Sequence, residues 1–103
     1  MKRLTRSLIT LFMGLSLSSV LATADVAKGQ TLYIEKIKPA CKMSGSSFAA
    51  KHSQDQWEKI YNSGKLNAEI QKLCSMTLDE NALPHIYDFA YEYASDSGNV
   101  PNF

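Results

Sequence analysis

The chain has 103 residues, 45% of them hydrophobic and 20% charged, and a formal net charge of +1 at pH 7. This length fits one small domain. Both arginines lie within the first six residues, so the rest of the chain lacks the side chain best suited to bidentate recognition of phosphate or guanine. We therefore expect no nucleic-acid binding.

The first 24 residues predict a cleaved secretory signal. Three basic residues near the start precede an apolar run at 8–21, and an Ala-Thr-Ala cleavage site ends at Ala24. The apolar run is shorter than the about 20 residues that a membrane span needs, and no second run follows it. We expect a soluble periplasmic protein with no membrane span after cleavage.

Cleavage after Ala24 would leave one domain, residues 25–103. This domain carries eight lysines against ten acidic residues, so its formal charge is −2. The core of so small a domain rarely supplies more than about 3 to 5 kcal/mol, so a covalent or cofactor staple is expected.

Helical spacing dominates the domain, which we expect to be all-α with about four short helices. Val26, Tyr33, Ile34 and Ile37 share one face of a first helix. This helix should end before Pro39, because proline disfavours helical backbone in the residue that precedes it.

The middle of the chain predicts a loop followed by a second helix. Residues 38–47 contain a proline, a glycine and three serines, which is typical of a loop. Ser53 and Gln56 have the spacing of a capping box, so the second helix should begin there and end at Gly64.

The third helix is predicted from Leu66, Ile70, Leu73 and Cys74, which follow helical spacing and place the cysteine on the core side.

A fourth helix should follow a second capping box. Thr77 and Glu80 have the required spacing, Pro84 suits a first helical turn, and the helix should end near Gly98. Its apolar residues lie on more than one side, which indicates a central helix. The predicted core consists of Trp57, Tyr61, Leu73, Ile86, Tyr87 and Tyr91.

Cys41 and Cys74 are expected to form a disulfide. In the chain-entropy model, closing a loop of this length stabilises the fold by about 3.5 to 4 kcal/mol. Two alternatives are a cysteine consumed by a cofactor and a pair of free thiols that act with a partner. The separation of the two cysteines disfavours a C-x-x-C oxidoreductase, whose two thiols lie one helical turn apart.

Residues 25–33 and 38–42 resemble the opening of a small class I cytochrome c. In that family a helix of the form A-x-G-x-x-L-Y leads into C-x-x-C-H, whose thiols bond the haem and whose histidine binds its iron. The register places Lys38 at the first cysteine, Cys41 at the second and Lys42 at the histidine. Two of the three attachment residues are therefore absent.

The resemblance extends along the chain. Residues 53–64, around Trp57, are similar to the middle helix of such cytochromes, and Met76–Glu80 is similar to their distal methionine loop. The resemblance implies a compact cytochrome c-like arrangement. In the leading hypothesis the helices keep this packing, and the Cys41–Cys74 disulfide expected above replaces the cofactor as staple.

No cofactor is expected, although haem is the possible one. Covalent haem could use Cys41, but iron binding by Lys42 would require a pKa several units below its usual 10.4. Non-covalent haem could use a histidine with a methionine. The candidates are His52, His85, Met43 and Met76.

Each candidate ligand also has a structural explanation. The methionines would fill gaps in the core. His52 would pack on Trp57 as a hydrophobic staple, and His85 would lie at the surface or an interface.

The remaining motifs favour binding over catalysis. No histidine, cysteine or acidic cluster has metal-ligand spacing, and no serine, histidine or cysteine set indicates a nucleophile, so we expect neither a metal site nor an enzyme. The leading interpretation is a non-enzymatic periplasmic binding or accessory protein with an unknown protein or small-ligand partner. The alternative is a haem-binding electron-transfer protein, and a thiol oxidoreductase is the third class.

Charge offers one hint about partners. Lys36, Lys38 and Lys42 surround Cys41 in the sequence, whereas acidic residues crowd the last helix. This asymmetry could steer an acidic partner to the basic end, or could be ordinary solvated charge.

Overall fold

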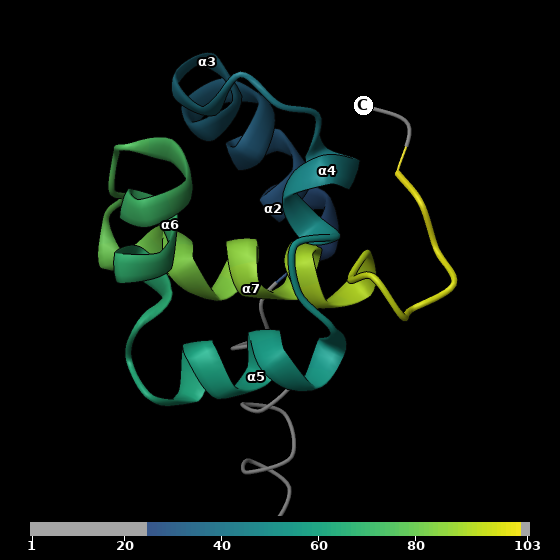
Figure 1. Ribbon diagram of the computed structural model, residues 1–103. Coiled ribbons are helices and arrows are strands. Elements are labelled where there is room, and N and C mark those ends of the chain that lie inside the picture. Colours follow the sequence, from purple (N-terminus) through teal and green to yellow (C-terminus); the bar gives the residue numbers. More distant parts are fainter. Residues whose placement is uncertain (1–24, 102–103) are drawn as a thin grey trace, which may run out of the picture.

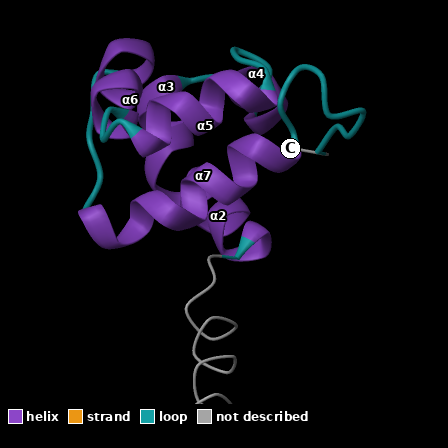
Figure 2. Cartoon of the chain, turned by 90° about the horizontal axis from the view of Figure 1, so that it is seen from below, coloured by secondary structure: helices purple, strands orange, loops and turns teal. Residues whose placement is uncertain are grey.

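Every regular element within the described residues is a helix, which confirms the all-α prediction (Figure 2). The computed structural model describes residues 25–101, so the predicted signal at 1–24 lies outside the described residues. In chain order the elements are α2 (Val26–Leu32), the π-helical turn η1 (Tyr33–Ile37), α3 (Lys38–Cys41), α4 (Gly45–Ala49), α5 (Gln54–Asn62), α6 (Leu66–Cys74), the 3-10 turn η2 (Glu80–Ala82) and α7 (Leu83–Glu92).

The prediction that the first helix ends before Pro39 is wrong, because the helical path continues through that residue. Asp25 caps α2 through hydrogen bonds from the N–H groups of Ala27 and Lys28, and the chain then continues helically through η1 into α3. In η1 the N–H of Lys38 donates to the carbonyl of Tyr33, five residues back. Pro39 follows this wider turn and lies in the first turn of α3, a position at which a helix tolerates proline.

The loop predicted at 38–47 is also wrong, because two short helices occupy most of it. Ser44 caps α4 by accepting from the N–H of Ser47. The cap directs Phe48 inward, where it is fully buried. Ser44 therefore serves as a helix cap, and Gly45, Ser46 and Ser47 belong to the helix that it begins.

The second and third helices agree with the sequence. The capping box of Ser53 and Gln56 begins α5, and Gly64 follows its end with φ +75°, a conformation that glycine adopts without steric cost. On α6, the side chains of Leu66, Ile70 and Cys74 are buried as predicted.

The fourth helix begins later and ends earlier than predicted. Thr77 and Glu80 form no capping box, because the backbone of Leu78 is held outside a helix by two hydrogen bonds with the Asn67 side chain, both 2.8 Å. η2 and α7 follow, with Pro84 in the first turn of α7.

The end of α7 is set by contacts with the start of α5. The N–H of Ser95 donates to the carbonyl of His52, and the carboxylate of Asp96 accepts from the N–H of Gln54. These bonds pull the chain out of the helical path after Glu92, well before Gly98.

As its apolar sides indicated, α7 is the central helix. It contacts α2, α4, α5 and α6, and lies across the middle of the molecule (Figure 1). Its crossing with α2 depends on Gly29, because a Cβ at that position would lie 2.1 Å from the carbonyl oxygen of His85 and 2.8 Å from the Cβ of Phe89. Only glycine permits this approach of the two backbones.

The core differs in part from the predicted set. Trp57 and Ile86 are fully buried as expected, whereas four predicted members are only half-buried: Tyr61, Leu73, Tyr87 and Tyr91. On α7 the side that faces the core carries Ile86, Phe89 and Ala90, so Tyr87 and Tyr91 lie at its edge. Tyr61 on α5 and Leu73 on α6 pack against the core from its edge. The largest fully buried side chains besides Trp57 and Ile86 are Tyr33, Phe48, Phe89, Ile37, Leu66 and Ile70.

The predicted disulfide is present between Cys41 and Cys74. It joins the C-terminal ends of α3 and α6, which lie side by side (Figure 1). The bridge therefore connects the two halves of the helical domain across a loop of 33 residues.

Candidate functional site

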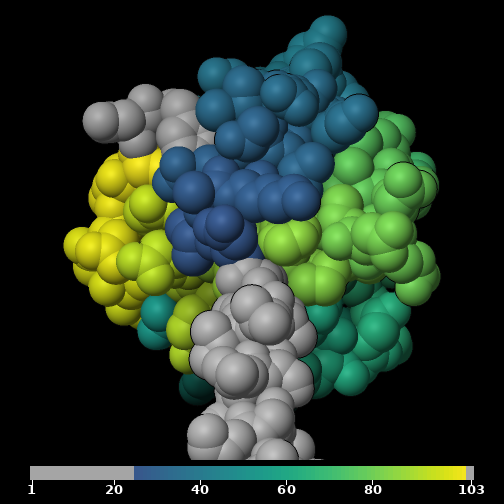
Figure 3. Space-filling model, turned by 180° about the vertical axis from the view of Figure 1, so that it is seen from behind, coloured from purple at the N-terminus to yellow at the C-terminus, as the bar shows by residue number. Residues whose placement is uncertain are grey.

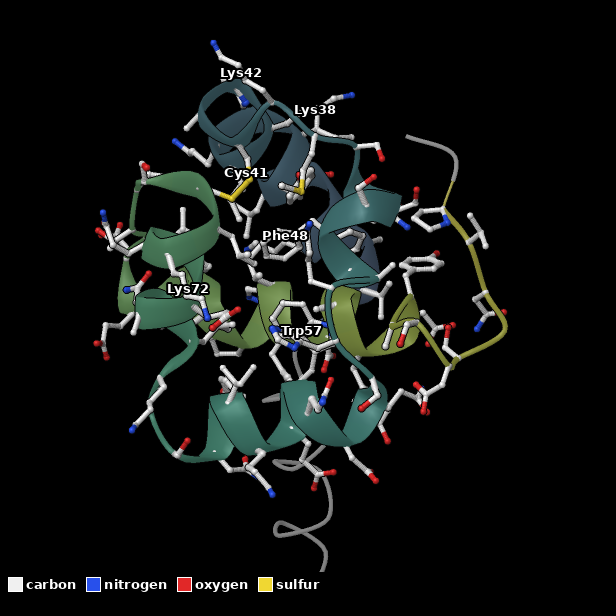
Figure 4. The ribbon with its side chains drawn as sticks, in the orientation of Figure 1. Lys38, Cys41, Lys42, Phe48, Trp57 and Lys72 are labelled. Atoms are coloured by element: carbon white, nitrogen blue, oxygen red, sulfur yellow. A yellow bond between two sulfur atoms is a disulfide. The ribbon has the colours of Figure 1, made fainter. Side chains whose placement is uncertain are left out.

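The disulfide lies near the α3 end of the molecule, where Figure 4 shows Lys38 and Lys42 beyond Cys41, and Lys72 lies on the other side of the bridge, lower on α6. Cys74 is 4% exposed and Cys41 is half-buried. Lys38 and Lys42 come from α3 and its C-cap, and Lys72 comes from α6. We call these three exposed side chains the lysine edge.

Tertiary structure adds Lys72 to the basic residues that the sequence placed around Cys41. The disulfide brings α6 beside α3 and so gathers charges that are 30 or more positions apart in the sequence. Lys72 is 72% exposed, and its Nζ atom lies 3.9 Å from Glu69. Glu69 is only 13% exposed and also binds His52, but the Lys72 ammonium remains largely in water and the contact is long, so Lys72 keeps its charge available to a partner.

The residues that the cytochrome c resemblance would align with the haem-attachment motif have other roles in this fold. Cys41 is bonded to Cys74, so it offers no thiol for a haem vinyl group. Lys42, at the histidine position, has φ +57° as the C-cap of α3 and is exposed. Lys38 stands at the first cysteine position and is also exposed.

A buried aromatic cluster fills the interior beside the disulfide. The ring of Phe48 lies 5.1 Å from that of Tyr33 and 5.4 Å from that of Trp57, and Tyr33 lies 5.5 Å from Phe89. Figure 4 shows Phe48 and Trp57 at the centre of the molecule. This cluster, Tyr33, Phe48, Trp57 and Phe89, occupies the space between the helices with protein side chains.

The polar atoms of the aromatic cluster are bound within the protein. The indole N–H of Trp57 donates to the carbonyl of Ala49 at 2.8 Å, and the hydroxyl of Tyr33 donates to that of Met43 at 2.7 Å. Burial raises the pKa of Tyr33 to about 12. The cluster thus has the hydrogen bonding expected of a permanent core.

His52 has the structural contacts that the staple interpretation predicted. Its ring meets Trp57 edge-on, with centroids 4.8 Å apart, and its Nε2 atom lies 2.8 Å from the carboxylate of Glu69. The side chain therefore ties the start of α5 to α6.

His85 lies elsewhere, in the first turns of α7. Its Nδ1 atom accepts a hydrogen bond of 3.1 Å from the backbone N–H of Asp25. Asp88 lies one turn further along α7, and burial raises the pKa of its carboxyl while the nearby His85 acts in the opposite direction. His85 thus contacts the start of α2.

The two methionines do not share a site with the histidines. Met43 packs against the core near Tyr33. Met76 lines a surface pocket of about 310 Å³, and neither Met43 nor either histidine is among the residues that line it. The structure therefore disperses the four candidate haem ligands instead of gathering them around one cavity.

Two further sequence expectations concern metals and membranes. Within residues 25–101, no three histidine, cysteine or acidic side chains are grouped so that they could hold a metal ion. Over the same range, no helix combines the length and the apolar character that crossing a membrane requires.

Sequence reasoning missed Phe48, Asn67 and the pocket beside Met76. Phe48 directly follows the predicted loop at 38–47 and was assigned to no helix, and the others depend on contacts between segments distant in the sequence. Comparison with known protein families, characterised proteins and solved structures finds no match to this chain.

Proposed function

We propose that this is a non-enzymatic periplasmic binding protein that resembles a class I cytochrome c without its haem and that binds an acidic partner protein through the lysine edge. The observation that carries the proposal is the disulfide: Cys41 is bonded to Cys74 at the position where the family bonds its cofactor. The staple is then covalent, and the helices need no haem to hold them together.

The residues of this chain do not fit a haem. The thiol is used, a lysine stands at the position of the iron-binding histidine, and the aromatic cluster fills the interior with satisfied polar groups. Inserting a large planar ring there would require buried side chains to leave a close-packed core. This argument favours the binding role over the alternative, an electron-transfer protein that holds haem.

The lysine edge supplies the surface for a partner. Lys38 and Lys42 lie beyond the half-buried disulfide at α3, and Lys72 lies on the covalently joined α6. Exposed carboxylates lie on α5 and α7, and α5 also carries the exposed Lys59. A molecule with charges separated in this way is oriented by an acidic surface before contact. The bridge holds the backbones of α3 and α6 together, which reduces the entropy lost when both helices contact one partner.

One expression experiment tests the cofactor and the staple together. The full chain is expressed in a host competent for cytochrome c maturation, and the purified protein is analysed by visible spectroscopy and non-reducing intact mass. We expect no Soret band, a mass that begins at Asp25, and the loss of two hydrogens for the disulfide. A Soret band or a haem-sized adduct would overturn the proposal and favour the electron-transfer alternative.

A charge-matched pair of variants tests the docking surface. The first variant carries glutamine in place of the three lysines of the lysine edge, Lys38, Lys42 and Lys72. The second carries glutamine in place of three other exposed lysines, Lys51, Lys59 and Lys65. Poly-L-glutamate is the defined acidic probe. We expect the first variant to bind about tenfold more weakly than the second at low salt, although both have the same net charge. Equal weakening of the two would show that net charge alone attracts the probe.

A further inference from the structure

A pocket of about 310 Å³ lies between the α2–η1 junction and the segment that links α6 to α7. Figure 3 shows the surfaces of these two parts of the chain meeting, blue against green. The apolar residues that line the pocket are Leu32, Met76, Leu78 and Ala82. Lys36 and Asp79 also line it, and both are exposed.

One wall of the pocket is held in place from α6. The side-chain amide of Asn67 donates to the carbonyl of Leu78 and accepts from its N–H, both at 2.8 Å. A residue whose backbone is bound on both sides cannot shift without losing two hydrogen bonds. The wall is thus formed before any ligand arrives, which favours binding of a small molecule.

The other wall comes from the π-helical turn. Lys36 belongs to η1 (Tyr33–Ile37), and the preceding Leu32 contributes apolar surface. Single π-helical turns often occur at functional sites, because they change which side chains face a given direction. The turn also carries the chain past Pro39, so its geometry is built into the fold.

The two charges of the pocket are available to a ligand. Among the residues that the structure describes, neither the ammonium of Lys36 nor the carboxylate of Asp79 has an ion-pair partner or a side-chain hydrogen bond. A ligand that carries both a negative and a positive charge could pair with the Lys36 ammonium and with the Asp79 carboxylate.

We propose that this pocket binds the zwitterion of an apolar α-amino acid. The ligand carboxylate would accept from Lys36, its ammonium would donate to Asp79, and its side chain would cover Met76 and the neighbouring apolar residues. A purely anionic or purely cationic ligand would leave one of the two charges unpaired. Lys36 is not part of the lysine edge, so this site and the proposed docking surface can fail independently.

Ligand chemistry provides the first test. The protein obtained by expression of the full chain is labelled with ¹⁵N and titrated with L-leucine and L-methionine. We expect saturable shifts of the Lys36, Met76 and Asp79 amides in the millimolar range. Glycine lacks the apolar side chain that would cover Met76. N-acetyl-leucine lacks the ammonium that would donate to Asp79, and leucine methyl ester lacks the carboxylate that would accept from Lys36. Each of these three should bind at least about fivefold more weakly than leucine.

Matched variants provide the second test. We expect Lys36→Gln and Asp79→Asn each to weaken leucine binding about fivefold, while the exposed controls Lys51→Gln and Asp55→Asn leave it unchanged. All four side chains are exposed, so the fold should survive each change. Binding of glycine as tight as that of leucine, equal effects of variants and controls, or no shift at about 50 mM ligand would overturn the proposal, since a millimolar site would be filled at that concentration.

Discussion

Replacing Gly29 with alanine tests the close crossing of α2 and α7. A decrease in the free energy of unfolding supports the crossing, and an increase contradicts it. In an isolated helix this change is favourable by about 1 kcal/mol, because alanine has the higher helix propensity. In this fold the new Cβ would lie 2.1 Å from the carbonyl oxygen of His85 and 2.8 Å from the Cβ of Phe89. The first of these is a backbone atom and cannot rotate away.

The size of the effect follows from that geometry. Cβ atoms do not approach heavy atoms closer than 3.0 Å, so the two helices would have to separate by about 1 Å at their closest point. Overpacking of this kind costs about 3 kcal/mol when only backbone movement relieves it. After subtraction of the propensity gain, we expect Gly29→Ala to lower the free energy of unfolding by about 2 kcal/mol, or the melting temperature by about 8 to 16 °C.

Urea denaturation followed by fluorescence is a suitable assay, because Trp57 is the single tryptophan and is fully buried. Lys28→Ala is the matched control, since Lys28 is the exposed neighbour in the same helix and its loss should change stability by no more than about 0.5 kcal/mol. If Gly29→Ala proves as stable as the natural protein or more so, the close crossing of α2 and α7 is wrong.

Three further outcomes are expected. Changing both Cys41 and Cys74 to serine should lower the free energy of unfolding by about 3.5 to 4 kcal/mol, measured in urea; an unchanged midpoint would refute the role of the bridge as staple. Ser75 has φ +56°, so Ser75→Gly should raise stability by about 0.5 kcal/mol, whereas Ser63→Gly, at a helix end with φ −91°, should not. The pKa of Tyr33 is about 12 in the fold and about 10 when unfolded, so the contribution of its neutral form is complete below pH 10 and is lost as the pH rises towards 12. The stability difference between the natural protein and Tyr33→Phe should therefore shift by up to about 2.7 kcal/mol in favour of the phenylalanine variant between pH 10 and 12; a constant difference would refute burial of the hydroxyl.

The helices that the sequence predicted best are those whose ends depend on neighbouring residues alone. The capping box of Ser53 and Gln56 and the stop at Gly64 act within one or two turns of α5, so no distant contact is needed to place them. Thr77 and Glu80 have the same spacing but form no cap, because Asn67 from another helix binds the intervening backbone. Identical local patterns thus gave different structures when a tertiary contact intervened.

The candidate site also has features that the sequence predicted and features that depend on the packing of distant segments. The pairing of Cys41 with Cys74 followed from composition alone, because the predicted domain has two cysteines and an expected oxidising location. The position of Lys72 beside Lys38 and Lys42 could not be read from the sequence, since it depends on the disulfide bringing α6 to α3. The dispersal of the candidate haem ligands likewise depends on how the helices pack.

By itself, the sequence determined the helical class, the middle helices and the disulfide, because helix caps and apolar spacing act over a few residues and two cysteines allow one pairing. Only the tertiary structure decided that the helix continues through Pro39, that Phe48 lies in the core and that Lys36 and Asp79 line one pocket. Those features depend on packing between distant segments, where the close approach at Gly29 and the hydrogen bonds of Asn67 override local preference.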